Sequence, residues 1–183
     1  RAEPQGLERI MTIDCEVIDL RPQKAAVVKA RVRVDELPDF FGEAFEATMS
    51  TIEQQGLEAT GPPFAYYPAT PTTVIHLEAG FPASDAVDPD GTVDAFELPG
   101  GAAVMTTHFG PYDTMEETYA LMRSWMADHG YEPSPGLWEV YLTGPDDEPD
   151  PARWRTRIVW PVKAGPAGRR PNGDDPALSR RYA

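Results

Sequence analysis

The sequence predicts an α+β fold built from two duplicated ββαββ-type halves, which are related by a pseudo-twofold axis and enclose a ligand cleft between them. The main observation is internal repetition, because strand-like and helix-like segments occur in the same order twice along the 183 residues. A proline follows the first strand of each half, and a glycine ends each helix. We therefore place one domain at residues 13–163, with half one at 13–82, a linker at 83–91 and half two at 92–163.

The strands are predicted from runs rich in β-branched and aromatic residues. Each half opens with two strands joined at a proline, Pro22 or Pro99, and we expect each pair to form a hairpin. The second strands of these pairs run from Val27 to Val34 and from Ala102 to Phe109. Two further strands follow the helix of each half.

The helices are predicted from apolar residues that recur with the 3.6-residue helical period. Asp35 can cap the first helix, and Thr114 with Glu117 forms a capping box for the second. Gly56 and Gly130 suit the left-handed position that follows a helix. The apolar stripes consist of Leu37, Phe41, Phe45, Thr48 and Ile52 in half one, and of Met115, Tyr119, Met122 and Met126 in half two.

Charge and composition narrow the class of ligand and the location. The formal net charge of −14 would repel a phosphate backbone, so we expect no direct nucleic-acid binding and favour cationic ligands. The apolar runs are far shorter than the roughly 20 residues of a membrane span, so we expect no membrane association. A single cysteine, Cys15, rules out an internal disulfide framework, and we expect a cytoplasmic protein.

The two ends of the chain differ in composition from the domain. Residues 1–12 form a charged, polar leader that we expect to be flexible. Residues 164–183 are rich in arginine and in turn-forming residues, which predicts a disordered tail. No helix-turn-helix precedes Ile13, so we expect a stand-alone protein.

The segment GLWEVYL, Gly136 to Leu142, reads as a buried strand but carries a carboxylate at its centre. Side chains alternate between the two faces of a strand, so Glu139 shares its face with Leu137 and Tyr141, while Trp138 points the other way. One acid therefore lies on an apolar, aromatic face. A buried carboxylate among aromatic rings would favour flat, lipophilic cations.

The repeat itself differs at this acid. Aligning the halves places Ala65 at the position of Glu139, which indicates an asymmetric ligand that needs charge on one side only. The alternative is an acid on a wet sheet edge, or one that pairs with an arginine of the next strand. Those arginines are Arg153, Arg155 and Arg157. The aromatic residues that could wall the cleft are Phe64, Tyr66, Tyr67, Tyr112, Trp138 and Tyr141.

Other reactive side chains show no pattern of a metal, phosphate or nucleophile site. His76, His108 and His129 have no metal-ligand spacing, and no cysteine pair accompanies them. The chain contains neither a glycine-rich phosphate loop nor a serine in a nucleophile-elbow motif. We therefore expect no metal, no cofactor and no covalent catalysis.

Three motifs of half two together resemble the GyrI-like small-molecule-binding family. They are HFGPY (His108 to Tyr112), W-x-x-x-x-G-Y-E-P (Trp125 to Pro133) and WEVYL (Trp138 to Leu142), and the likeness extends from Ile13 to Lys163. The resemblance implies a duplicated ββαββ fold with a cleft between the halves. Family members include effector-binding domains of multidrug-sensing regulators, proteins that sequester toxic compounds, a gyrase-inhibitory protein and hydrolases of cyclopropane-bearing genotoxins.

The resemblance also implies a role for each site residue. Glu139 takes the position of the family's central cleft acid, which meets the positive charge of aromatic drugs. The function we favour is binding and sequestration of flat lipophilic or cationic aromatic compounds. The alternative is a cyclopropanoid hydrolase in which Glu139 activates water and Tyr112 and Tyr141, with Tyr67 after them, assist at the substrate carbonyl. A further alternative is a DNA gyrase-modulating protein.

Overall fold

The computed structural model describes residues 13–69 and 73–163. The leader predicted at 1–12 and the tail predicted at 164–183 lie outside the described residues. Two α-helices are described, α1 (Leu37–Gln54) and α2 (Met115–Asp128), with short 3-10 turns at Val34–Glu36, Tyr112–Thr114 and Pro151–Arg153. The strands are β1 (Glu16–Leu20), β2 (Gln23–Arg33), β3 (Phe64–Tyr67), β4 (Val74–Pro82), β5 (Val93–Leu98), β6 (Gly101–Phe109), β7 (Glu132–Pro133), β8 (Leu137–Thr143) and β9 (Arg155–Lys163).

Both predicted helices form, but their starts differ from the expectation. A 3-10 turn precedes each helix, so Glu36 and Thr114 occupy the N-cap positions, and neither side chain caps the first turn of its α-helix. The Glu36 side chain accepts from the amide of Arg33, in a capping box at the start of the 3-10 turn. The Thr114 hydroxyl instead donates to the carbonyl of Pro111. The predicted helix ends are confirmed, because Gly56 and Gly130 have φ angles of 69° and 75°.

The two predicted hairpins are wrong. β1 pairs with β6 instead of β2, and β5 pairs with β2 instead of β6, so each half gives its first strand to the other half. The favoured two-residue hairpin turns need a positive φ at their first connecting residue. Neither Arg21 nor Pro22, nor Pro99 nor Gly100, has a positive φ. The chain therefore runs on past each proline and pairs elsewhere.

The strands form one antiparallel sheet in the order β1-β6-β9-β8-β3-β4-β2-β5, with β7 beside β9. In chain order, β1, β2, β3 and β4 of half one correspond to β5, β6, β8 and β9 of half two. When each strand is replaced by its counterpart, the strand order read from one end of the sheet equals the order read from the other end. The halves meet where β3 pairs with β8, and in that pair Ala65 lies opposite Glu139. The position at which the repeat differs is thus the junction of the two halves.

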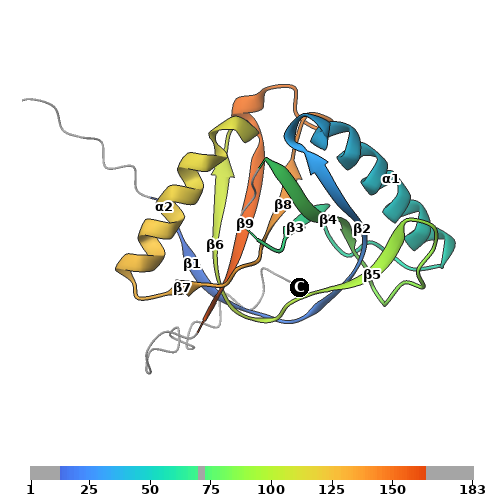
Figure 1. The fold of residues 1–183 in the computed structure, drawn as a ribbon, viewed down its shortest axis with the longest axis horizontal. Coiled ribbons are helices and arrows are strands. Elements are labelled where there is room, and N and C mark those ends of the chain that lie inside the picture. The colour runs from blue at the N-terminus through green and yellow to red at the C-terminus, as the bar shows by residue number, and fades with distance from the viewer. Residues whose placement is uncertain (1–12, 70–72, 164–183) are drawn as a thin grey trace, which may run out of the picture.

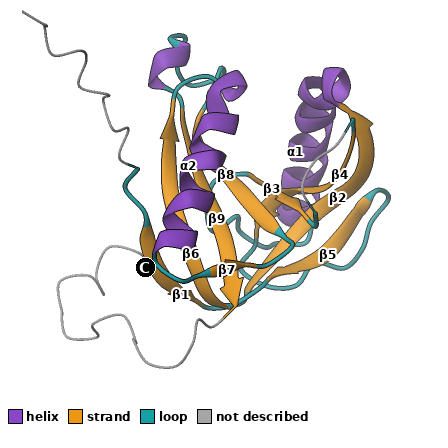
Figure 2. Ribbon diagram, turned by 60° about the vertical axis from the view of Figure 1, so that its left-hand side comes forward, coloured by secondary structure: helices purple, strands orange, loops and turns teal. Residues whose placement is uncertain are grey.

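Both helices lie on the same face of this sheet, with α2 against one half and α1 against the other (Figures 1 and 2). The helix face carries the larger core cluster, which includes Met122 of α2, Ala44 of α1 and Ile158 of β9. The opposite face carries a second cluster, in which Trp138 packs with residues from strands at both ends of the sheet, Leu20 and Leu98. The sheet is therefore strongly curved around this second cluster.

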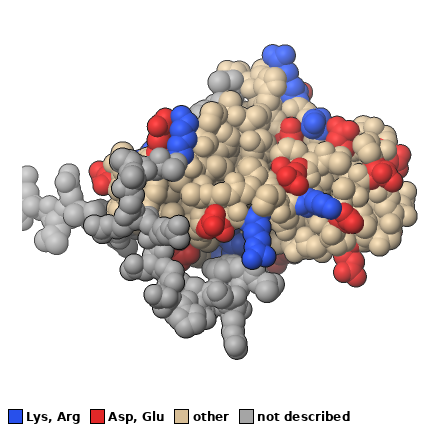
Figure 3. Space-filling model, turned by 90° about the horizontal axis from the view of Figure 1, so that it is seen from below, with Lys and Arg blue, Asp and Glu red and all other residues tan. Residues whose placement is uncertain are grey.

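The surface carries mixed charge. On the face drawn in Figure 3, Lys and Arg side chains are dispersed among Asp and Glu and do not gather in one continuous basic patch. No helix in the described part of the chain is long and apolar enough to cross a membrane.

The connection between β1 and β2 passes close to the connection between β5 and β6, and this contact gives a test of the topology. A Cβ atom added at Gly100 would lie 2.6 Å from Cδ of Pro22 and 2.9 Å from the carbonyl oxygen of Leu20. Gly100→Ala should lower the free energy of unfolding by about 1–3 kcal/mol, because backbone and a proline ring must move apart. Urea denaturation followed by circular dichroism measures this change.

Gly42 provides the matched control, because a Cβ at this exposed position of α1 meets nothing within 4 Å. Gly42→Ala should raise the free energy of unfolding by about 0.5–1 kcal/mol through helix propensity. Equal destabilisation by the two substitutions would contradict the close crossing at Gly100.

Candidate functional site

The candidate site is built around Glu139, which β8 holds on the helix face of the sheet at the junction of the halves. Its side chain is 8% exposed. None of the ion pairs in the described part of the chain includes Glu139. The expected alternative of a cross-strand ion pair is wrong, because Arg157 lies opposite Val140 and Arg153 pairs with Glu148 and Asp150.

Three tyrosine hydroxyls surround the carboxylate. Tyr119 of α2 donates to Oε1 of Glu139 at 2.5 Å, and Tyr141 of β8 donates to Oε2 at 2.8 Å. Tyr67 of β3 lies 3.5 Å from Oε2 and 3.4 Å from the Tyr141 hydroxyl. The carboxylate is thus satisfied by neutral donors drawn from both halves of the protein.

Aromatic rings extend this cluster outward on two sides. From α1, Phe41 and Phe45 place their ring centroids 5.6 Å and 6.2 Å from that of Tyr141. From the turn before α2, Tyr112 meets Tyr141 edge to face at 5.9 Å and lies 5.1 Å from Trp154. Tyr112 is 40% exposed, so the cluster opens to solvent on this side.

The ionisation of the cluster follows from burial. Desolvation raises the pKa of Glu139 above its usual range, and the hydrogen bonds from Tyr119, Tyr141 and Tyr67 oppose that rise. Desolvation and the charge of Glu139 raise the pKa of all three phenols well above the ordinary tyrosine value. The same two causes raise the pKa of Tyr112. The hydroxyls therefore remain protonated donors at neutral pH.

Four of the seven residues predicted for the site come together here: Glu139, Tyr67, Tyr112 and Tyr141. The other three lie across the sheet, because strand alternation turns their side chains away from the acid. Tyr66 and Trp138 are opposite each other in the β3·β8 pair, and both pack in the second cluster with Phe64. The structure therefore does not bring these three rings to the carboxylate.

Sequence reasoning missed three contributors, Tyr119, Phe41 and Phe45, which it had assigned to the apolar helix stripes alone. A usable signal was present, because both stripes must cover the sheet face toward which Glu139 points. Tyr119 is the one residue of the α2 stripe with a hydroxyl. A buried phenol needs a hydrogen-bond partner, and the acid on the facing strand supplies one.

The two halves place related aromatic pairs around the site but differ in polarity. Phe45 of α1 packs edge to face on Phe81 of β4 at 5.7 Å, and Tyr119 of α2 packs edge to face on Trp160 of β9 at 6.0 Å. Half two thus has a hydroxyl on its helix where half one has only a ring, and a carboxylate where half one has Ala65. The acid and the helix hydroxyl that donates to it, Tyr119, occur in the same half.

No group of three or more His, Cys, Asp or Glu side chains that could hold a metal ion occurs within the described ranges. A cavity of about 820 Å³ lies beside β6 and the outer side of α2. None of its lining residues belongs to the Glu139 cluster, so the cavity is a separate feature of the surface.

Comparison with known proteins agrees with this architecture. The GyrI-like small molecule binding domain matches residues 13–163. The chain belongs to the GyrI-like small-molecule-binding family. No curated protein matches the sequence.

Solved structures with a similar fold include EcmrR in a complex with DNA, with a TM-score of 0.74 at 22% identity over 85% of this chain and 59% of the EcmrR chain. The isolated C-terminal domain of EcmrR is similar over 84% of this chain and 99% of that domain, with a TM-score of 0.65 at 23% identity. The present chain therefore spans less than two thirds of EcmrR.

Two further similar structures carry functional descriptions. SAV2435 bound to tetraphenylphosphonium has a TM-score of 0.51 at 10% identity, over 82% of this chain and 94% of that one. A hydrolase from Listeria innocua has a TM-score of 0.58 at 14% identity, over 85% of this chain and 94% of that one. At these identities the likeness shows the shared fold.

The raised pKa of Glu139 predicts how the site affects stability. The pKa of Glu139 is higher in the folded state than in the unfolded state, so the unfolded state releases its proton more readily. The carboxyl therefore destabilises the folded state once the pH exceeds the unfolded-state pKa. Glu139→Gln should therefore increase the free energy of unfolding at pH 7, and the gain should vanish below about pH 4, where the acid is protonated in both states. Urea titrations at several pH values measure the difference.

Glu97→Gln, at an exposed position of β5, is the control for removal of one negative charge. It should leave the pH profile of stability almost unchanged. A Glu139→Gln protein that is less stable than the wild type at pH 7 would contradict the prediction, because the tyrosine hydrogen bonds would then outweigh the desolvation.

Proposed function

We propose that this protein binds lipophilic aromatic cations at the Glu139 cluster, between α1 and α2. The observation that carries the proposal is a buried carboxylate that has tyrosine hydroxyls and no cation as its partners within the described residues. Its negative charge is only partly offset by these neutral dipoles. A bound cation would supply the missing countercharge at a place where solvent screening is weak.

The surrounding rings suit a lipophilic cation better than a hydrated one. The rings of Phe41, Phe45 and Tyr112 pack around Tyr141, whose hydroxyl bonds the acid. Each ring face that a cation contacts contributes about 0.5–2 kcal/mol through cation–π attraction, in addition to the apolar area that it buries. The partly exposed side of Tyr112 is the route by which we expect a ligand to enter.

The structural neighbours support the ligand class. SAV2435 was solved with tetraphenylphosphonium, a lipophilic aromatic cation, and shares the fold of this chain. EcmrR has a C-terminal domain of this fold within a DNA-bound protein. For the present chain we propose only that it binds the same class of ligand, lipophilic aromatic cations.

We also infer that the protein is a duplicated ββαββ unit, with a pseudo-twofold axis at the β3·β8 junction and the ligand cleft on that axis. The palindromic strand order and the pairing of Ala65 with Glu139 support this inference. A site on such an axis would be symmetric in shape. Its charge would lie on one side of the axis, because the carboxylate of Glu139 comes from half two and Ala65 of half one lies opposite it.

A hydrolase that uses Glu139 to activate water is the second candidate. The raised pKa of the acid favours it, because a carboxylate with a higher pKa is a stronger base. The hydrogen bonds from Tyr119 and Tyr141 weigh against it, since each occupies a lone pair of the carboxylate and lowers its basicity. Binding therefore explains the geometry with fewer rearrangements.

Calorimetric titration with tetraphenylphosphonium tests the binding proposal. Saturable binding to the wild-type chain is expected, and Glu139→Gln should raise the Kd at least tenfold, about 1.4 kcal/mol, because the countercharge is lost. Glu97→Gln removes the same charge from an exposed site and should change the Kd less than twofold. Equal losses in the two variants would contradict a local role for Glu139.

Turnover is tested with the same variants. The protein is incubated with a cyclopropane-bearing DNA alkylator, and ring-opened product is followed by mass spectrometry. We expect no product above the protein-free control. Product that accumulates catalytically with the wild type and disappears with Glu139→Gln would replace the binding proposal with the hydrolase.

The donor pattern predicts a preference among cations. Both carboxylate oxygens of Glu139 already accept hydrogen bonds, so a primary ammonium would lose water ligands without replacing them fully. Tetraphenylphosphonium should bind at least tenfold more tightly than a triphenyl-substituted primary ammonium of similar size, measured by competition. Tyr119→Phe frees one carboxylate lone pair and should narrow this ratio. An unchanged ratio would show that the tyrosine donors do not set the preference.

A further inference from the structure

Among the residues that the structure describes, one stretch of the sheet has no neighbouring strand on one side. β1 pairs with β6 only as far as Glu16 opposite Met105. The last four residues of β6, Thr106 to Phe109, pair with β9 on one side. On the other side, the Thr106 side chain contacts the preceding chain, because its hydroxyl donates to the carbonyl of Asp14 and it also interacts with the Cys15 thiol. In the described part of the chain, Thr106 to Phe109 therefore form an edge of the sheet, although β6 is not a terminal strand.

The hydrogen bonds between β6 and β9 show which backbone amide and carbonyl groups of β6 face that edge. The amide of Gly110 donates to the carbonyl of Trp154, on the β9 side. Backbone groups alternate between the two sides of an antiparallel strand, so His108 also faces β9. Thr107 and Phe109 therefore present their amide and carbonyl groups to the free edge. No backbone hydrogen bond from these two residues to the segment before β1 is found among the described residues.

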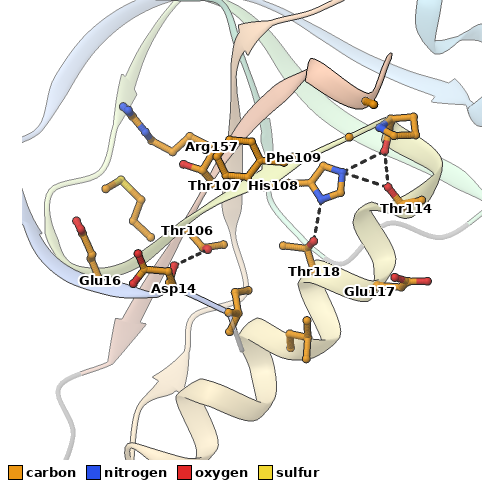
Figure 4. Close-up of a pocket in the computed structure, with 16 residues that line it drawn as sticks. Asp14, Glu16, Thr106, Thr107, His108, Phe109, Thr114, Glu117, Thr118 and Arg157 are labelled. Atoms are coloured by element: carbon orange, nitrogen blue, oxygen red, sulfur yellow. Dashed lines mark hydrogen bonds between the residues drawn. The ribbon is translucent and has the colours of Figure 1, made fainter. Parts of the chain in front are cut away.

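The cavity of about 820 Å³ lies along this edge (Figure 4). Its lining includes residues from both faces of β6. His108 points toward Thr118 of α2, while Thr107 and Phe109 lie on the other side of the strand. A cavity that borders both faces of a strand extends outward from its edge. The cavity therefore lies where a further strand would pair with Thr106 to Phe109 of β6.

The edge is apolar and its surroundings are acidic. Phe109 is 69% exposed, more than any other large apolar residue of the described chain. Asp14, Glu16 and Glu117 line the cavity, against one cationic residue, Arg157. The added strand would thus meet an exposed aromatic ring on one face and a net negative charge around it.

Other edges of the same sheet are protected, which makes this one unusual. Terminal strand β1 carries Glu16 and Asp19, and terminal strand β5 carries Asp94 and Glu97. Charged residues on an edge strand discourage pairing with another chain. The segment TTHF of β6 carries no lysine, acid or proline.

We propose that the β6 edge from Thr106 to Phe109 is a docking site for an extended, basic peptide segment of a partner protein, which adds to the sheet as a further strand. Backbone bonds to Thr107 and Phe109 would hold the segment. Apolar side chains would cover Phe109, and alternating basic side chains would meet Glu117 and the acids of the β1 segment. This site is distinct from the Glu139 cluster, since none of the residues that line the cavity belongs to that cluster.

The probe is the fluorescein-labelled hexapeptide acetyl-Lys-Val-Lys-Val-Lys-Val-amide, titrated into the full chain with fluorescence anisotropy as the readout. Two N-methylated versions, one at all lysines and one at all valines, separate strand pairing from charge attraction. Only one alternate set of amides can face β6. We expect one version to bind like the parent peptide and the other at least tenfold more weakly. Equal binding of both, or no binding of the parent, would overturn the proposal.

Matched variants locate the site. Phe109→Lys places a charge on the edge and should weaken peptide binding at least tenfold. Val34→Lys changes another exposed apolar residue, which is 60% exposed and lies outside the cavity, and should alter binding less than twofold. Both variants add the same charge, so equal losses would indicate general electrostatic repulsion and contradict the proposed site.

Amide hydrogen exchange decides whether the edge is free. In the isolated protein, the amides of Thr107 and Phe109 should exchange rapidly, and the peptide should slow them at least tenfold. Slow exchange without peptide would show that the chain's own termini or a second copy already cover the edge. That result would overturn docking of a partner segment.

Discussion

The burial of one carboxylate at the junction of two half-sheets is the constraint on which the site depends. Glu139 projects from the strand pair that joins the halves, so its hydrogen-bond partners come from β3, β8 and α2 at once. An acid at this depth needs donors, and three phenols supply them without neutralising its charge. The result is a buried carboxylate whose hydrogen-bond partners in the described chain are all neutral hydroxyls.

The same arrangement explains why the halves differ where they do. Both halves contain a helix, a strand at the junction and an edge-to-face aromatic pair. An acid without a donor would be strongly destabilised by burial, and a buried phenol without an acceptor would lose a hydrogen bond. Glu139 and Tyr119 are therefore matched, because the phenol supplies one of the hydrogen bonds that the buried carboxylate accepts.

Strand exchange links the halves mechanically and shapes the outer surface. β1 pairs with half two and β5 pairs with half one, so neither half has a complete sheet of its own. Because β1 is shorter than β6, no described strand pairs with the end of β6 on the side of β1. One topological feature thus accounts for the joined half-sheets beneath Glu139 and for this end of β6.

Local patterns in the sequence determined the helices, most of the strands and the acid within an apolar strand, because periodicity and alternation depend on neighbouring residues. Alternation also fixed Glu139 and Tyr141 on one face of their strand. Only the tertiary structure decided that the first strands exchange, that Tyr66 and Trp138 lie across the sheet, and that Tyr119 meets the acid. Strand pairing and helix placement join residues far apart in the chain, and a single sequence carries no local signal for such partners.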